Sequence, residues 1–136
     1  MANSIAIGVA YKDQDIVGAS QIYSDSEIGY TAAAQGTVTQ ATSKSTAVTL
    51  NKPAGQITLN NAALAATTTV TFTFNNSYIS ANDTVILTIA SGGTAGAYNA
   101  WISGLAAGSC TVAFRNVTAG ALGEAVVLNF AIIHCV

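Results

Sequence analysis

Charged side chains are scarce in this sequence. Asp, Glu, Lys and Arg make up 7% of its 136 residues, against about 25% in ordinary soluble domains. The four basic residues, Lys12, Lys44, Lys52 and Arg115, are scattered, whereas binding to nucleic acid requires them to be clustered. We therefore expect no nucleic-acid partner. A net charge of −2 gives little repulsion between copies, so we expect an assembled protein rather than a neutral, threonine-rich monomer.

Long apolar runs and a secretion signal are also missing. No apolar run reaches the roughly 18–20 residues that cross a membrane as a helix. Residues 1–15 lack the basic segment and apolar core of a signal peptide. We therefore expect no membrane partner and a chain that is made and used in a cytoplasm.

The residues that carry catalysis or bind metals are few. Cys110 and Cys135 are too few for a disulfide framework. We expect both to be buried thiols, bridged only if their strands are neighbours. His134 is the one histidine and has no metal-ligand spacing to either cysteine. It also points to the opposite strand face from Cys135. The sequence thus predicts no catalytic residue, no metal site and no cofactor.

Apolar and polar residues alternate with a period of two from Gly36 onward, which is typical of β-strands. Thr69–Asn75 is the clearest case, with Val70, Phe72 and Phe74 opposed to threonines. The other predicted strands are Thr37–Gln40, Thr46–Leu50, Gln56–Leu59, Asp83–Ala90, Cys110–Arg115 and Glu124–His134. The first three, separated by turn-like residues 43–45 and 51–55, predict a β-meander. Asp83 and Glu124 each open a strand and are expected to be exposed there.

The spacing of these strands predicts an all-β fold, a jelly-roll-like antiparallel β-sandwich of about eight strands. We assign residues 28–136 to this domain. Residues 1–27 differ, because their apolar residues are isolated except in the weakly alternating segment Ser4–Ala10. This part is either an extended arm that lies across a neighbouring subunit or the first strand of the same domain.

Glu124–His134 is apolar on both faces, with Leu128 and Ile132 opposed to Val127 and Ile133. One face needs a core and the other needs a second apolar surface, which in a small all-β protein is often a subunit interface. The candidate interface residues come from this strand and from the N-terminal segment. They are Ile5, Ile7, Val9, Tyr11, Ile16, Val17, Ile22, Tyr23, Val127 and Ile133.

Three longer motifs carry a resemblance to a known class of protein. They are GTVTQATSKSTAVTLNK (Gly36–Lys52), GQITLNNAALAA (Gly55–Ala66) and AVVLNF (Ala125–Phe130). Together they resemble a β-rich, C-terminal-type domain of tailed-bacteriophage and prophage virion surface proteins, which include capsid decoration and fibre proteins. The resemblance covers Ile28 to His134 and brings no catalytic residue. It implies a virion component, and trimers are usual in such proteins.

The resemblance and the low charge together predict a non-enzymatic capsid decoration (cement) protein. It would form a homotrimer, bind the major capsid protein on the capsid surface and be assembled in the host bacterial cytoplasm. We prefer this to a tail fibre because the chain has no long repetitive shaft. The alternative is a tail-fibre or tail-tip module that recognises a host surface glycan through Tyr78, Tyr98 or Trp101. Tyr98 and Trp101 are three apart, so on a strand one would face the core.

Overall fold

The computed structural model of the chain describes residues 18–135, which form an all-β protein of eight strands. A turn of 3-10 helix, η1 (Ala32–Ala34), precedes the first strand. The strands are β1 (Gln35–Thr39), β2 (Val48–Thr49), β3 (Ala54–Thr58), β4 (Thr69–Asn75), β5 (Thr84–Ser91), β6 (Tyr98–Ala106), β7 (Ser109–Asn116) and β8 (Val127–Ile133). The predicted all-β class is confirmed.

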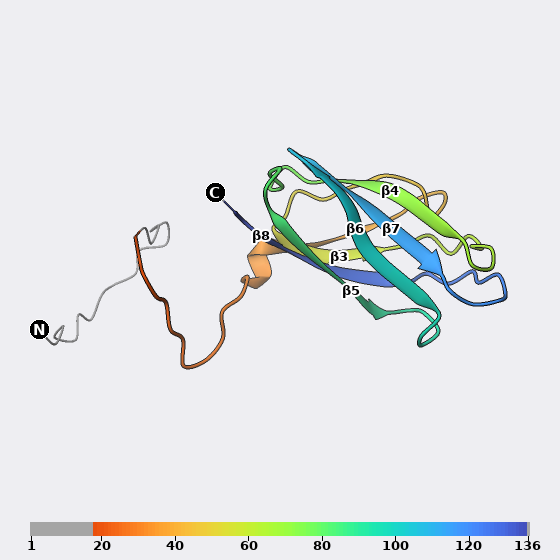
Figure 1. The fold of residues 1–136 in the computed structure, drawn as a ribbon, viewed down its shortest axis with the longest axis horizontal. Helices are drawn as coiled ribbons and strands as arrows, with labels where there is room; N and C mark the ends of the chain where they lie inside the picture. The colour runs from red at the N-terminus through yellow and green to blue at the C-terminus, as the bar shows by residue number, and fades with distance from the viewer. Residues whose placement is uncertain (1–17, 136) are drawn as a thin grey trace, which may run out of the picture.

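The strands form two four-stranded sheets that lie face to face (Figure 1). Sheet A has the order β1-β3-β8-β5 and sheet B the order β2-β4-β7-β6. Both sheets are mixed, because β1 is parallel to β3 and β2 is parallel to β4. The prediction of purely antiparallel sheets is therefore wrong.

The predicted β-meander is also wrong, for the same reason. Parallel neighbours need a crossover connection, and here the chain supplies one by alternating between the sheets. It passes from β1 in sheet A through β2 in sheet B before it returns to β3. Local turn signals identified the breaks between these strands, but a break of this kind does not reveal whether the chain turns back or changes sheet.

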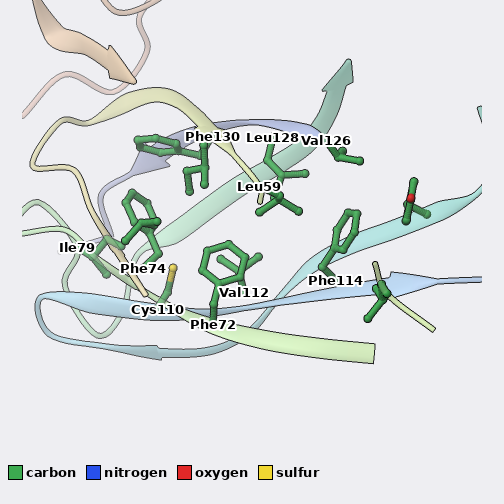
Figure 2. Close-up of a cluster of buried hydrophobic side chains, with 14 of the residues drawn as sticks. Leu59, Phe72, Phe74, Ile79, Cys110, Val112, Phe114, Val126, Leu128 and Phe130 are labelled. Carbon is green, nitrogen blue, oxygen red and sulfur yellow. The ribbon is translucent and has the colours of Figure 1, made fainter. Parts of the chain in front are cut away.

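The inner faces of the two sheets meet in one apolar core (Figure 2). The predicted alternation of β4 is confirmed, since Phe72 and Phe74 are buried while the intervening threonines are exposed. Phe74 of sheet B meets Phe130 of sheet A edge to face, with ring centroids 4.8 Å apart. Such aromatic pairs add to the stabilisation from area burial, so this contact holds the two sheets together.

Strand β6 was not predicted. It pairs with β7 and carries an irregularity between Ile102 and Gly104, which shifts the register and breaks the period of two. Tyr98 at its start is buried, whereas Trp101 is 40% exposed on the outer face. The prediction that one of these two aromatic residues faces the core is confirmed.

Lys44 is an unexpected part of the interior. It lies in the segment predicted to be a turn, yet it is only 4% exposed. Its Nζ donates hydrogen bonds to the backbone carbonyls of Asn60 and Glu124, the latter at 2.6 Å. Burial lowers the pKa of Lys44, and the nearby Glu124 carboxylate partly opposes that shift. Lys44 thus connects its own loop to the loops that contain Asn60 and Glu124.

The N-terminal segment stands apart from the sheets as far as the structure describes it. Residues 18–31 are exposed, contain no strand and lead away from both sheets (Figure 1). Their first connection to a sheet is the Tyr30 hydroxyl, which donates to the carbonyl of Ile132 on β8. The division at residues 27 and 28 stays a prediction. Within residues 18–135 no helix is long and apolar enough to cross a membrane.

Candidate functional site

The outer face of sheet A is the candidate site, and we call it the sheet A surface. The strand registers place Ile133 beside Thr84, Ala131 between Ala54 and Ile86, and Asn129 between Gln56 and Thr88. None of the side chains on this surface ionises. They are Gln35, Thr37 and Thr39 of β1, Ala54, Gln56 and Thr58 of β3, Val127, Asn129, Ala131 and Ile133 of β8, and Thr84, Ile86, Thr88 and Ala90 of β5.

The sheet A surface has an apolar end and a polar middle. At the apolar end Ile133 is 52% exposed and Ile86 is 45% exposed. In the middle the Gln56 side-chain amide donates to Oδ1 of Asn129 at 3.0 Å. Val127 lies on the same face as Ile133, as predicted, but at the other end of β8 and partly buried. The role of these two residues in an interface stays a prediction.

A hollow of about 580 Å³ interrupts this surface over β1 and β3. It lies around the pair Gly36 and Gly55 and is lined by side chains of both strands, Gln35 and Thr37 of β1 and Ala54 and Gln56 of β3, together with Asn129 of β8. A Cβ on Gly55 would be 2.1 Å from the carbonyl oxygen of Gly36. Glycine is therefore required at position 55 for the two strands to approach each other.

The exposed N-terminal segment joins the protein at the apolar end of this surface, because Tyr30 bonds to Ile132. The predicted interface residues Ile22 and Tyr23 lie on this segment and are 64% and 83% exposed. Ile28, which sequence reasoning did not select, is 79% exposed. The other predicted interface residues of this segment, Ile5, Ile7, Val9, Tyr11, Ile16 and Val17, lie outside the described residues.

The outer face of sheet B is different in composition. It carries the threonines of β4. Trp101 of β6 lies opposite Ala113 of β7, and Arg115, the next residue of β7 on the same face, lies between Asn99 and Thr69. The three aromatic residues proposed for glycan recognition are not brought together on it. Tyr98 is in the core, and Tyr78, 46% exposed, lies in the loop after β4.

Asp83 is buried rather than exposed, so that prediction is wrong. Its carboxylate accepts hydrogen bonds from the Ser80 backbone N–H at 2.8 Å, the Ser80 hydroxyl at 2.5 Å and the Cys135 N–H at 3.2 Å. His134 Nδ1 lies 2.9 Å from it. The bonds from Ser80, followed by those from His134 and Cys135, hold the pKa of Asp83 well below its usual value. Asp83 thus fastens the end of β8 to the start of β5.

Glu124 and the cysteines also depart in part from their predicted places. Glu124 precedes β8, is partly buried and accepts hydrogen bonds from the N–H and hydroxyl of Thr94 at 3.1 and 2.9 Å. Cys110 is buried as predicted, and burial raises its pKa to about 11. Cys135 is exposed, which is contrary to prediction, and neither cysteine is in a disulfide.

Within residues 18–135 no group of three or more His, Cys, Asp and Glu side chains is placed to hold a metal ion. No family model, curated protein or solved structure matches this chain. The resemblance to bacteriophage virion proteins therefore stays a prediction.

Proposed function

We propose that this chain is a non-enzymatic bacteriophage virion protein, a homotrimeric capsid decoration (cement) protein that binds the major capsid protein and stabilises the head shell. The observation that carries the proposal is the uncharged sheet A surface, with Ile86 and Ile133 exposed where the N-terminal segment joins it. Binding to the assembled shell stabilises that shell by mass action, without chemistry.

The composition of the sheet A surface suits an interface. Charged residues are depleted at the centres of protein interfaces, because a buried charge must be paired at a cost in desolvation. This surface has no charge to remove from water, and its threonine, asparagine and glutamine side chains can both donate and accept hydrogen bonds across a contact. In this proposal it holds the copies of the trimer together, and residues 1–27 reach the capsid or a neighbouring copy.

The proposal includes two finer features of the fold. Residues 1–27 act as an extended arm, which the exposure of residues 18–27 supports. The winding is jelly-roll-like apart from the parallel edges β1 and β2, which the alternation of β1 to β6 between the two sheets supports. In a jelly roll a long hairpin wraps so that successive strands fall in opposite sheets.

The test is the copy number and location of this chain on purified particles, by gel densitometry and imaging, together with its oligomeric state in solution by native mass spectrometry. The proposal expects a trimer in solution and hundreds of copies over the head, as expected for a symmetric surface lattice. A few copies at the tail, or a monomer at every concentration, would contradict it.

A second function, recognition of a host glycan by a tail tip, is favoured by one observation. Trp101 is 40% exposed on the outer face of sheet B, two register positions from the Asn99–Arg115 pair and on the same face. An aromatic ring beside such donors is suited to stacking on a sugar and to hydrogen bonding its hydroxyls. Saccharide binding that quenches Trp101 fluorescence and is lost in Arg115→Ala would support glycan recognition. Hundreds of copies of the chain over the head would contradict it.

A further inference from the structure

The apolar core is incompletely covered along β5 and β6. These two strands end their sheets on the same side of the molecule and contact each other (Figure 1). On β5 the inward side chains Val85 and Leu87 are only partly buried, and Ile89 is 40% exposed. On the neighbouring strand β8, Leu128 and Ile132 are fully buried. A line of inward-facing apolar side chains therefore remains open to solvent at this side.

The backbone of β5 is open at the same place. It spans eight residues and pairs only with β8 among the strands that the structure describes. Its outer row of N–H and C=O groups is thus available to a further strand. Natural edge strands are usually short or protected by charged residues or proline, and Thr84–Ser91 contains neither. A hollow of about 470 Å³ lies between its start and residues Ile102–Leu105 of β6.

We propose that residues 4–11 of a second copy add to β5 as an extra strand. The segment alternates apolar and small residues, so Ile5, Ile7 and Val9 fall on one face of a strand. That face would cover Val85, Leu87 and Ile89. This inference rests on the proposed self-association and names the contact that the arm makes.

The other sheet edges fit this segment less well. β1 has five residues, and the side chains of Leu50 and Lys52 lie against it at Gly36. Strand β2 has two residues. In β6 the register shift between Ile102 and Gly104 interrupts the edge in its middle, whereas the shift in β5 lies near its end, after Ile89.

The described part of the N-terminal segment favours a neighbouring copy as the acceptor. It leads away from the sheets of its own copy (Figure 1), and the side-chain bonds of residues 18–27 stay within the segment, from Tyr23 to Gln21 and from Ser26 to Ser24. Residues 12–29 can span up to about 60 Å when extended. That is enough to cross a subunit boundary.

Interchain disulfides between differently tagged full-length chains test the contact, with Cys135→Ser in every chain. One chain carries Ile7→Cys, and the others carry Val85→Cys, Leu87→Cys or Ile89→Cys. We expect at least one mixture to give a cross-linked pair on a non-reducing gel, because opposed residues on neighbouring strands are close enough to bridge. Ser20→Cys replaces Ile7→Cys as the control and should give none. A further chain carries Ile7→Cys and a β5 cysteine together. If this chain forms a disulfide within itself and no mixture forms one between chains, the proposal is overturned.

A charge placed on either face of the segment gives a second test. Ile7→Lys should raise the concentration at which the native oligomer dissociates by about tenfold or more. Ala6→Lys adds the same charge on the opposite face and should have little effect. An oligomer that is insensitive to Ile7→Lys, together with no cross-link, overturns this inference and leaves the proposed self-association standing. A native chain that is monomeric at every concentration overturns both.

Discussion

Replacing Ile133 by lysine should weaken the assembly of the chain while leaving each subunit folded. Ile133 is at the apolar end of the sheet A surface and is 52% exposed in the single chain. Because Ile133 is the last residue of β8 and half of its side chain is exposed to solvent, a lysine at this position can extend into water. Exposed substitutions of this kind usually change the free energy of unfolding by no more than about 0.5 kcal/mol.

The expected effect on assembly follows from the exposed half of the side chain. Burying a whole isoleucine stabilises by roughly 1.5–3 kcal/mol, so the half that remains to be buried contributes about 1 kcal/mol per subunit. At about 1.4 kcal/mol for each tenfold change, this is about fivefold per subunit. For three equivalent subunits the dissociation constant of the trimer should rise about a hundredfold. The cost of removing the lysine ammonium from water adds to this.

Sedimentation velocity over a concentration series measures this effect, with urea unfolding as the check on the subunit. Val117→Lys is the matched control, because Val117 is 38% exposed and lies outside the sheet A surface. The lysine at 133 should shift dissociation to higher concentration and the control should not. If Ile133→Lys assembles at the same concentration as the native chain, the sheet A surface is not the interface.

Three other substitutions test the structure of the single chain. Lys44→Met removes the donor to two backbone carbonyls and should lower the free energy of unfolding by about 2 kcal/mol in urea; an unchanged midpoint would contradict the role assigned to Lys44. Burial raises the pKa of Cys110 from 9.0 to about 11, so above pH 9 the thiol ionises more readily in the unfolded chain than in the folded one. The contribution of the neutral thiol to the free energy of unfolding is therefore full below pH 9 and is lost as pH rises through 11, by up to about 2.7 kcal/mol. Cys110→Ala should make the fall in stability between pH 8 and pH 11 shallower, and an equally steep fall would refute this. Gly55→Ala forces a Cβ against the Gly36 carbonyl and should lower stability by about 1–3 kcal/mol, whereas Gly120→Ala, with open space around it, is the control in a thermal melt.

Strand positions could be predicted where the period of two runs unbroken. In β4 the apolar residues alternate with threonine over the whole strand, so its bounds Thr69–Asn75 were found. Strand β6 was missed because Ser103 is an extra residue between two paired positions, and the apolar pattern changes face at that point. A bulge of this kind is local in structure but removes the period on which the prediction depends.

Sheet membership and buried polar residues could not be predicted. β1 pairs with β3 although β2, which lies between them in the sequence, belongs to the other sheet. No local sequence signal indicates this change of sheet. Lys44 looked like a solvated turn residue, because the carbonyls that it bonds, those of Asn60 and Glu124, are distant in sequence. The same holds for Asp83, whose partners include His134 at the far end of the chain.

The sheet A surface could be predicted in part. Val127 and Ile133 were assigned to the outer face of β8 from alternation alone, and both are there. Its uncharged composition follows from the low charge of the whole sequence. The partners that flank β8, and therefore the shape of the surface, depend on the strand order.

The alternation of the chain between the sheets also determines how it can fold. Among the described strands, β6 and β7 are the one pair that is adjacent in both the sequence and a sheet, joined across Ala107 and Gly108. Every other pairing closes a loop through at least one strand of the opposite sheet, and contacts that are distant in sequence make folding slow. We expect the β6–β7 hairpin to form first and the parallel edges β1 and β2 to form last. A newly made chain would then pass through states with open, uncharged strand edges, so its yield should depend on how quickly it finds its partners.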